Sequence, residues 1–196
     1  MSEKLPLILG SGSVFRREQL VRLGLAFQTA SPDFDETPVR GEHAQTTALR
    51  LAEGKAHALA QCFPHALVIG ADQVAWCGQR QLGKPMNVAN AQQMLAELSG
   101  KRIEFYSAIV LLNTVSGRLQ RHVDQTTVIM RELTDAQIRR YLQREPEAVY
   151  CAGAAKSEGL GAALLAKIDS TDPNALIGLP IFRLIDFLKN EGVEVL

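Results

Sequence analysis

The residues best suited to chemistry begin at a turn of small residues. Gly10-Ser11-Gly12-Ser13 follows a short apolar run and precedes two adjacent arginines, Arg16 and Arg17. Ser13 suits the N-cap of a helix that begins there, and a helix N-terminus offers backbone amides and the positive end of its dipole. The spacing is neither that of a Walker loop nor that of a dinucleotide fingerprint. It predicts a site for an anion such as phosphate, and the alternative is an ordinary turn with solvated arginines.

Carboxylates gather at two further places. Asp33, Asp35 and Glu36 lie in a proline-bracketed loop that follows a predicted strand, and Asp72 ends an apolar run over 66–71. The ends of such strands are a recurrent place for a metal ligand or a general base. The alternatives are solvated loop carboxylates and an Asx turn that caps the strand at Asp72.

Two lysines complete the charged candidates. Lys55 lies in a predicted helix over 42–61, where a lone lysine is usually solvated. Lys84 lies between Gly83 and Pro85, in a loop whose fixed exit could aim the side chain at a ligand. Cations for phosphate oxygens, together with acids for a metal or a water, are what the opening of a phosphoanhydride requires.

Composition limits the class of protein. The chain has 196 residues, 46% hydrophobic and 21% charged, with Lys+Arg 21 balanced by Asp+Glu 21. This indicates a globular protein and argues against a general nucleic-acid or membrane binder. Cys62, Cys77 and Cys151 lack CxxC spacing, so we expect buried free thiols in a reducing compartment. The start, over 1–6, has no signal-peptide pattern, which favours the cytoplasm.

Hydrophobic periodicity predicts an α/β fold. We expect strands over 5–9, 26–30, 66–74, 103–113 and 119–131, and a hairpin over 76–82. Helices are expected over 14–23, 42–61, 87–98, 134–143 and 181–190, and the segment over 162–168 is either helical or extended. Thr134 and Gln137 should form a capping box at the start of the fourth helix, and Asp172-Pro173-Asn174 should form a turn. The buried stripe of the last helix should include Phe182, Ile185, Leu188 and Leu184.

The ordered motifs resemble those of the Maf-like nucleoside triphosphate pyrophosphatases, nearly from end to end. They are residues 11–17, 35–37, 52–56, 70–74, 83–85, 151–159 and 177–180. The resemblance implies a single domain over 1–196, with a mixed twisted sheet flanked by helices and two lobes around a central cleft. It also implies a divalent cation (Mg²⁺, Mn²⁺ or Co²⁺), a nucleoside triphosphate substrate and a homodimer.

The family cleaves a nucleoside triphosphate between its α and β phosphates. Carried onto this chain, the resemblance implies that Asp72 accepts a proton from the attacking water, and that Glu36 and Asp72 hold the metal. It implies catalytic roles for Glu36, Lys55 and Lys84, and triphosphate binding by Ser11, Arg16 and Arg17.

Two residues resemble the branch of the family that acts on 7-methyl-GTP. The branch that acts on dTTP and UTP usually has threonine and glutamine where this chain has Gln73 and Glu158. A carboxylate accepts two hydrogen bonds, and the Watson–Crick edge of guanine offers two adjacent donors. We therefore predict a specificity role for Gln73 and Glu158; the alternative for Glu158 is a solvated glutamate beside Lys156.

Two positions depart from the family pattern. Val14 stands where the family has proline, and Phe15 stands where the 7-methyl-GTP branch usually has tryptophan. N7-methylation makes guanine cationic, and phenylalanine is a weaker partner for a cation than tryptophan. We hypothesise that Phe15 keeps the stacking but discriminates less against unmethylated GTP.

The leading hypothesis is an enzyme that converts 7-methyl-GTP to 7-methyl-GMP and diphosphate, so that modified nucleotides do not enter nucleic acids. One alternative is a dTTP/UTP-type pyrophosphatase of the same family. Another is a nucleotide-binding regulator of septum formation. A regulator needs phosphate donors but no general base, so the presence of Asp72 with Glu36 favours the enzyme.

Overall fold

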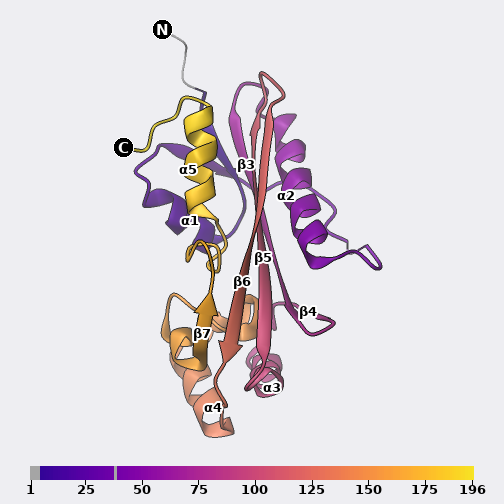
Figure 1. The fold of residues 1–196 in the computed structure, drawn as a ribbon, viewed down its shortest axis with the longest axis vertical. Coiled ribbons are helices and arrows are strands. Elements are labelled where there is room, and N and C mark those ends of the chain that lie inside the picture. Colours follow the sequence, from indigo (N-terminus) through magenta and orange to yellow (C-terminus); the bar gives the residue numbers. More distant parts are fainter. Residues whose placement is uncertain (1–4, 38) are drawn as a thin grey trace. The chain divides into compact units, whose positions relative to one another are not determined.

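The computed structural model describes residues 5–37 and 39–196 and has a mixed α/β fold, as predicted (Figure 1). The first four residues and Pro38 of the acidic loop lie outside the described residues. The strands are β1 (Leu7–Gly10), β2 (Phe27–Ala30), β3 (Leu67–Cys77), β4 (Arg80–Leu82), β5 (Arg102–Asn113), β6 (Leu119–Met130) and β7 (Leu165–Asp169). The helices are α1 (Val14–Val21), α2 (Ala44–Ala60), α3 (Val88–Leu98), α4 (Asp135–Arg144) and α5 (Ile181–Asn190).

Within the described residues, seven strands form one sheet in the order β2-β1-β3-β5-β6-β7, with β4 paired to β3. The chain divides into two compact units. Among the described residues, the first contains those up to Gln73 together with 107–124 and 172–196, and the second contains 74–106 and 125–171. Strands β3, β5 and β6 contribute residues to both units. The single domain and the central cleft implied by the resemblance stay predictions.

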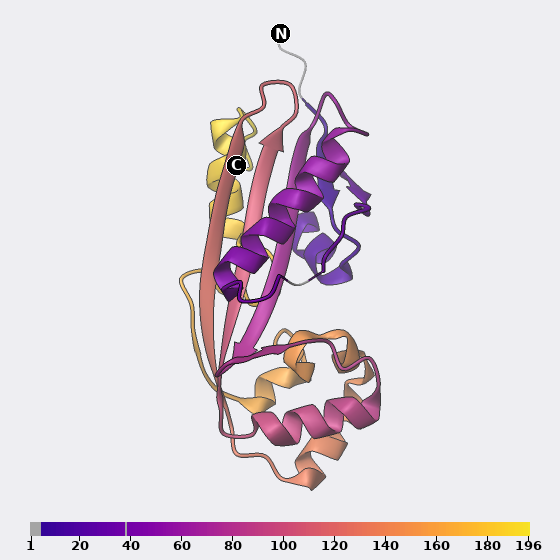
Figure 2. The same ribbon diagram turned by 90° about the vertical axis from the view of Figure 1, so that its right-hand side faces the viewer.

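In the first unit, β1 lies between β2 and β3 and is parallel to both. Its last pairs are Gly10 with Ala30 and Gly10 with Gly70. Helix α2 covers one face of these strands (Figure 2), and a Cβ atom on Gly70 would lie 2.2 Å from the carbonyl oxygen of Ala52. Glycine is therefore required at Gly70 because the helix backbone approaches the strand directly.

Helices α1 and α5 cover the other face of the first unit (Figures 1 and 2). Helix α5 buries Ile181, Leu184, Phe187 and Leu188, whereas Phe182 is 55% exposed. The prediction that Phe182 belongs to the buried stripe was wrong. Successive helical residues are rotated by about 100°, so the burial of Ile181 turns Phe182 outward.

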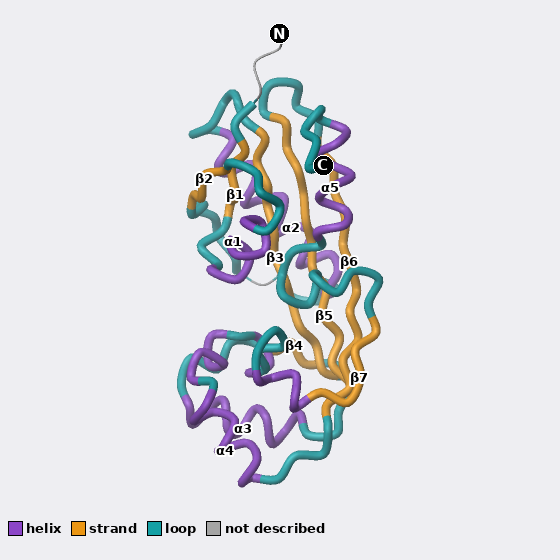
Figure 3. The backbone as a smooth tube through the Cα atoms, turned by 90° about the vertical axis from the view of Figure 1, so that its left-hand side faces the viewer, coloured by secondary structure: helices purple, strands orange, loops and turns teal. Residues whose placement is uncertain are grey.

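The second unit confirms several local predictions. The hairpin turns at Gly78, whose φ is +61°, and joins β3 to antiparallel β4. The predicted capping box of α4 is present between Thr134 and Gln137. The segment over 162–168, expected to be helical or extended, contains both kinds of structure. It includes the end of a 3₁₀ turn, Leu160–Leu164, and the first residues of β7, which pairs with β6 (Figure 3). No helix of the described residues is long and apolar enough to cross a membrane.

All three cysteines are free, but their predicted burial was wrong. Cys62 is exposed, and Cys77 and Cys151 are half-buried. Partial burial, with a smaller contribution from the charge of Glu158, raises the pKa of the Cys151 thiol to about 11.

Cys62 should therefore be alkylated much faster than Cys151. The thiolate is the reactive form of a cysteine. Because the pKa of Cys151 is raised to about 11, the fraction of Cys151 that is thiolate near neutral pH falls about 100-fold. Iodoacetamide labelling at pH 8, followed by peptide mass mapping, should show Cys62 reacting at least about tenfold faster. Equal rates at the two positions would contradict this account of Cys151.

Candidate active site

The turn between β1 and α1 has the local structure that its sequence predicts. Ser13 is the N-cap of α1, and its hydroxyl oxygen accepts a hydrogen bond from the Arg16 amide at 3.4 Å. Phe15 follows on the first turn of α1 and is half-buried. A pocket of about 120 Å³ opens beside this helix N-terminus. It is lined by Ser11, Gly12, Ser13, Val14, Arg17, Thr29, Ala30 and Ser31.

The two arginines of the motif are placed differently. Arg17 is exposed and lines the pocket, whereas Arg16 turns back toward the protein. Arg16 Nε donates to the carbonyl oxygen of Gly178 at 3.0 Å, and Nη1 donates to Ser11 Oγ at 3.2 Å. Burial lowers the pKa of Arg16, and the negative charges of Asp72 and Glu36 act in the opposite direction. The guanidinium therefore lies within the electrostatic reach of both carboxylates.

Lys55, Asp72 and Glu36 form one charged cluster, which we call the carboxylate–lysine cluster. Lys55 Nζ lies 2.7 Å from Asp72 Oδ1 and 3.0 Å from Glu36 Oε2. The side chains of Lys55 and Asp72 are 9% and 11% exposed, whereas that of Glu36 is 55% exposed. A buried ammonium therefore joins a buried carboxylate to one that water reaches.

The register of the sheet explains where Asp72 lies. The predicted strand over 66–74 was too short, because β3 continues to Cys77 by pairing with β4 from Ala75 onward. The pairing of β3 with β1 ends earlier, at Gly70. Asp72 therefore lies two residues beyond the carboxyl end of β1, the edge at which parallel α/β sheets usually place their sites.

The carboxylate–lysine cluster fits a divalent cation that arrives with a substrate. The described residues contain no group of three or more His, Cys, Asp or Glu residues arranged to hold a metal. Glu36 and Asp72 supply two carboxylates that already share one cationic partner, Lys55. Mg²⁺ is commonly held by one or two carboxylates together with substrate phosphates and water. The pair therefore suits a metal completed by phosphate oxygens rather than a closed protein cage.

Comparison with known proteins decides the family. A family model described as Maf-like protein matches residues 6–191. A protein of Neisseria gonorrhoeae is 70% identical over 196 residues, which cover 100% of both chains. A protein of Chromobacterium violaceum is 55% identical over 190 residues, which cover 97% of this chain and 98% of the relative. This chain belongs to the Maf family. Both relatives bear the name 7-methyl-GTP pyrophosphatase.

In this Maf protein, Gln73 contacts the protein rather than open solvent. Its Nε2 lies 2.9 Å from Ser107 Oγ and 3.0 Å from the carbonyl oxygens of both Ala175 and Leu176. Ser107 Oγ also donates to Ala175 at 2.7 Å. The segment that these bonds hold continues to Gly178, the residue whose carbonyl holds Arg16.

A second set of bonds fixes the same segment. Buried Asp172 accepts from the amides of Asn174 at 2.9 Å and Phe182 at 2.8 Å. Gln19 Nε2 donates to the Asn174 carbonyl at 2.8 Å. The sequence predicts Asp172 only as part of a turn. It does not reveal that Gln19 and Ser107 hold the segment, or that the Gly178 carbonyl holds Arg16. The one signal for these bonds was Gln73, an amide side chain beside Asp72 in a strand that is mostly apolar.

Lys84 and Glu158 belong to the second unit of this Maf protein. Both lie close enough to Cys151 to act on the pKa of its thiol, Glu158 raising it and Lys84 lowering it. The Lys156 ammonium contacts Glu147, and it lies 3.5 Å from Glu145. The side chains of Lys84 and Glu158 therefore each lie within the electrostatic reach of Cys151. Their predicted approach to the carboxylate–lysine cluster stays a prediction.

Proposed function

We propose that this Maf protein hydrolyses 7-methyl-GTP, with water, to 7-methyl-GMP and diphosphate. The observation that carries the proposal is the carboxylate–lysine cluster, which lies within the electrostatic reach of an arginine of the β1–α1 turn. The relatives named 7-methyl-GTP pyrophosphatase, similar over essentially the full chain, support the choice of nucleotide. Removal of the modified nucleotide would keep it out of nucleic acids.

The proposed chemistry separates proton transfer from charge neutralisation. Asp72 accepts the proton of the water that cleaves the bond between the α and β phosphates. Ser11, Arg16, Arg17, Lys55 and Lys84 bind the phosphate oxygens. Because Ser11 Oγ accepts hydrogen bonds from the Ser13 amide and from Arg16, its own proton is suited for donation to the substrate.

Glu36 and Asp72 are the residues that would hold a divalent cation (Mg²⁺, Mn²⁺ or Co²⁺). The cation would neutralise phosphate oxygens and lower the pKa of a bound water. The exposure of Glu36 suits this role, because a carboxylate at the surface can meet a cation that enters with the nucleotide.

Recognition of the base is assigned to Glu158 and Phe15. Glu158 accepts from the two adjacent donors of guanine, and Phe15 stacks on the ring. Gln73 acts through the segment over 174–178 that its amide holds, since both carbonyl oxygens within its reach belong to that segment. Its contribution to specificity is therefore to shape the site.

We also propose a homodimer in the cytoplasm that binds neither nucleic acid nor membranes. The balanced charge of the chain supports the absence of a general polyanion partner. The homodimer rests on the resemblance described above, and the three free cysteines, which suit a reducing compartment, support the cytoplasmic location. Sedimentation of the purified chain tests the dimer.

Measurement of diphosphate release with Mg²⁺ or Mn²⁺, across the canonical nucleoside triphosphates and 7-methyl-GTP, tests the proposed function. Preferential release from 7-methyl-GTP is expected. Release mainly from dTTP or UTP would keep the enzyme class and overturn the assigned roles of Gln73 and Glu158. Tight nucleotide binding without release from any of them would instead support the regulator.

Phe15→Trp should sharpen the preference for the methylated base. A better face for the cationic ring is expected to raise the ratio of kcat/KM for 7-methyl-GTP to that for GTP by about threefold. Phe182→Trp, at an exposed position of α5, is the matched control and should leave the ratio unchanged. A ratio that does not move in Phe15→Trp would remove the stacking role.

A further inference from the structure

Gly54 lies in the interior of α2, where glycine is a poor helix former. A Cβ atom on Gly54 would lie 2.1 Å from Phe34 Cζ and 2.3 Å from Phe34 Cε2. The ring of Phe34 therefore rests directly on the bare backbone of the helix. Any side chain at position 54 would expel it.

This contact places the acidic loop next to Lys55. Phe34 is two residues before Glu36, and Gly54 is the residue before Lys55. The ion pair between Glu36 and Lys55, at 3.0 Å, thus lies beside the point where the loop rests on the helix. An exposed carboxylate such as Glu36 gains little from an ion pair alone, because its side chain keeps many rotamers in water. A second attachment of the loop would restrict it.

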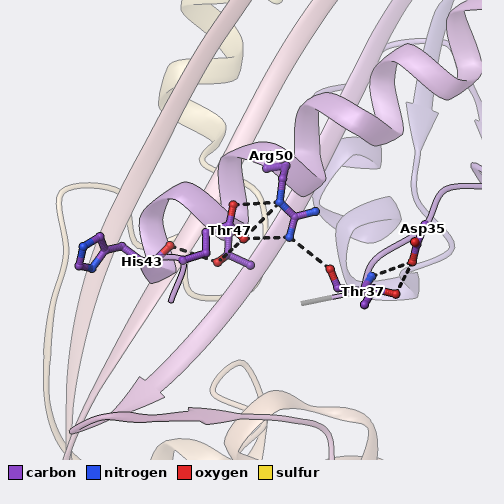
Figure 4. A network of polar contacts seen from close by, with 6 residues as sticks. Asp35, Thr37, His43, Thr47 and Arg50 are labelled. Carbon is purple, nitrogen blue, oxygen red and sulfur yellow. Dashed lines mark hydrogen bonds and ion pairs between the residues drawn. The ribbon is translucent and has the colours of Figure 1, made fainter. Parts of the chain in front are cut away.

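A further contact holds the other end of the loop to the same helix (Figure 4). Arg50 lies one turn before Gly54, and its Nη2 is 3.5 Å from the carbonyl oxygen of Thr37. The same guanidinium donates to Glu42 from both Nε and Nη2 at 2.9 Å. Glu36 is therefore flanked by two points of attachment, Phe34 on Gly54 and Thr37 on Arg50.

We propose that Phe34 and Gly54 are positioning residues that hold Glu36 against Lys55 and Asp72, in readiness for a divalent cation. The proposal rests on the proposed function, in which Glu36 and Asp72 hold that cation. Phe34 touches neither substrate nor metal in this account. It acts only through the place that it gives to Glu36.

Gly54→Ala and Phe34→Ala test the contact from its two sides. Alanine at position 54 favours the helix, so the fold should persist while the ring is displaced. Loss of a residue that orients a ligand commonly weakens metal affinity 10–100-fold. We expect Mn²⁺ affinity, measured by electron paramagnetic resonance in the presence of a non-hydrolysable α,β-methylene analogue of GTP, to fall about tenfold in each variant. Phe63→Ala truncates another half-buried phenylalanine of the same unit and should leave the affinity unchanged.

The Glu36→Gln background separates positioning from a general structural effect. If Phe34 acts through Glu36, Phe34→Ala weakens Mn²⁺ binding in the parent chain but adds nothing in Glu36→Gln. An equal loss in both backgrounds, parental affinity in Gly54→Ala, or no Mn²⁺ binding by the parent chain together with the nucleotide analogue would overturn the proposal. Absence of diphosphate release from every nucleotide, with the Mn²⁺ pattern intact, would instead count against the proposed function alone.

Discussion

Asp72→Asn is expected to lower kcat for diphosphate release from 7-methyl-GTP by about 10³-fold, within the range known for removal of a general base. The amide keeps the shape of the carboxylate, and its oxygen can still accept from Lys55 Nζ, which lies 2.7 Å from Asp72 Oδ1. It cannot take a proton from water. Steady-state kinetics at saturating Mg²⁺ would measure the loss.

The fold of the variant must be shown to be intact. Asp72 is buried in β3, so circular dichroism and urea unfolding should accompany the kinetics. Asp186→Asn provides a matched control, because Asp186 lies on α5 in the same unit, is exposed and pairs only with nearby Arg183 among the contacts described. Its kcat should stay close to that of the parent chain. More than about a tenth of parental activity in Asp72→Asn would rule out the assigned base.

Lys55→Met is expected to lower the free energy of unfolding by about 3 kcal/mol, the lower end of the range for removal of one partner of a buried ion pair. Methionine preserves much of the apolar stem, but Asp72 would remain in a buried position without its cation. The loss of unfolding free energy should stay near the low end of that range, because the second partner of Lys55, Glu36, is exposed and water can solvate its charge. Urea denaturation measures this difference.

A double-mutant cycle isolates the charge. In the Asp72→Asn background the neutral amide needs no cation, so Lys55→Met should cost less than about 1 kcal/mol there. Lys167→Met, which breaks the exposed pair with Asp169, should cost less than about 1 kcal/mol in the parent chain. If Lys55→Met were equally destabilising with aspartate and with asparagine at position 72, the buried ion pair would not be the cause.

Local sequence determined the features of the fold and of the site that depend on neighbouring residues. The turn at Ser11 and Ser13, the start of α1 and the capping box at Thr134 all involve residues within a few positions of one another. Short-range hydrogen bonds of this kind are encoded by residue type and spacing. The α/β fold class likewise followed from periodicity, which the strands and helices confirm.

Tertiary structure alone decided what the charged residues touch. The helical pattern around Lys55 does not distinguish it from a solvated lysine, and only the resemblance of residues 52–56 implies a role for it. Helix α2 crosses the sheet so closely that the Lys55 ammonium is buried against Asp72. Gln73 lies more than a hundred residues before the segment over 174–178. Its amide donates to this segment, whose Gly178 carbonyl accepts a hydrogen bond from Arg16, only because β3 and the segment before α5 meet in the fold.

The same reason explains the errors. Phe182 was assigned to the buried stripe because periodicity gives a helix face but not which neighbouring face the helix meets. The length of β3 was underestimated because it is set by pairing with β4, not by the apolar run. The sequence alone therefore determined which residues could do the chemistry and the local structure that presents them. The packing of α2 and α5 on the sheet decided which of them meet, since burial and ion pairing depend on contacts distant in the chain.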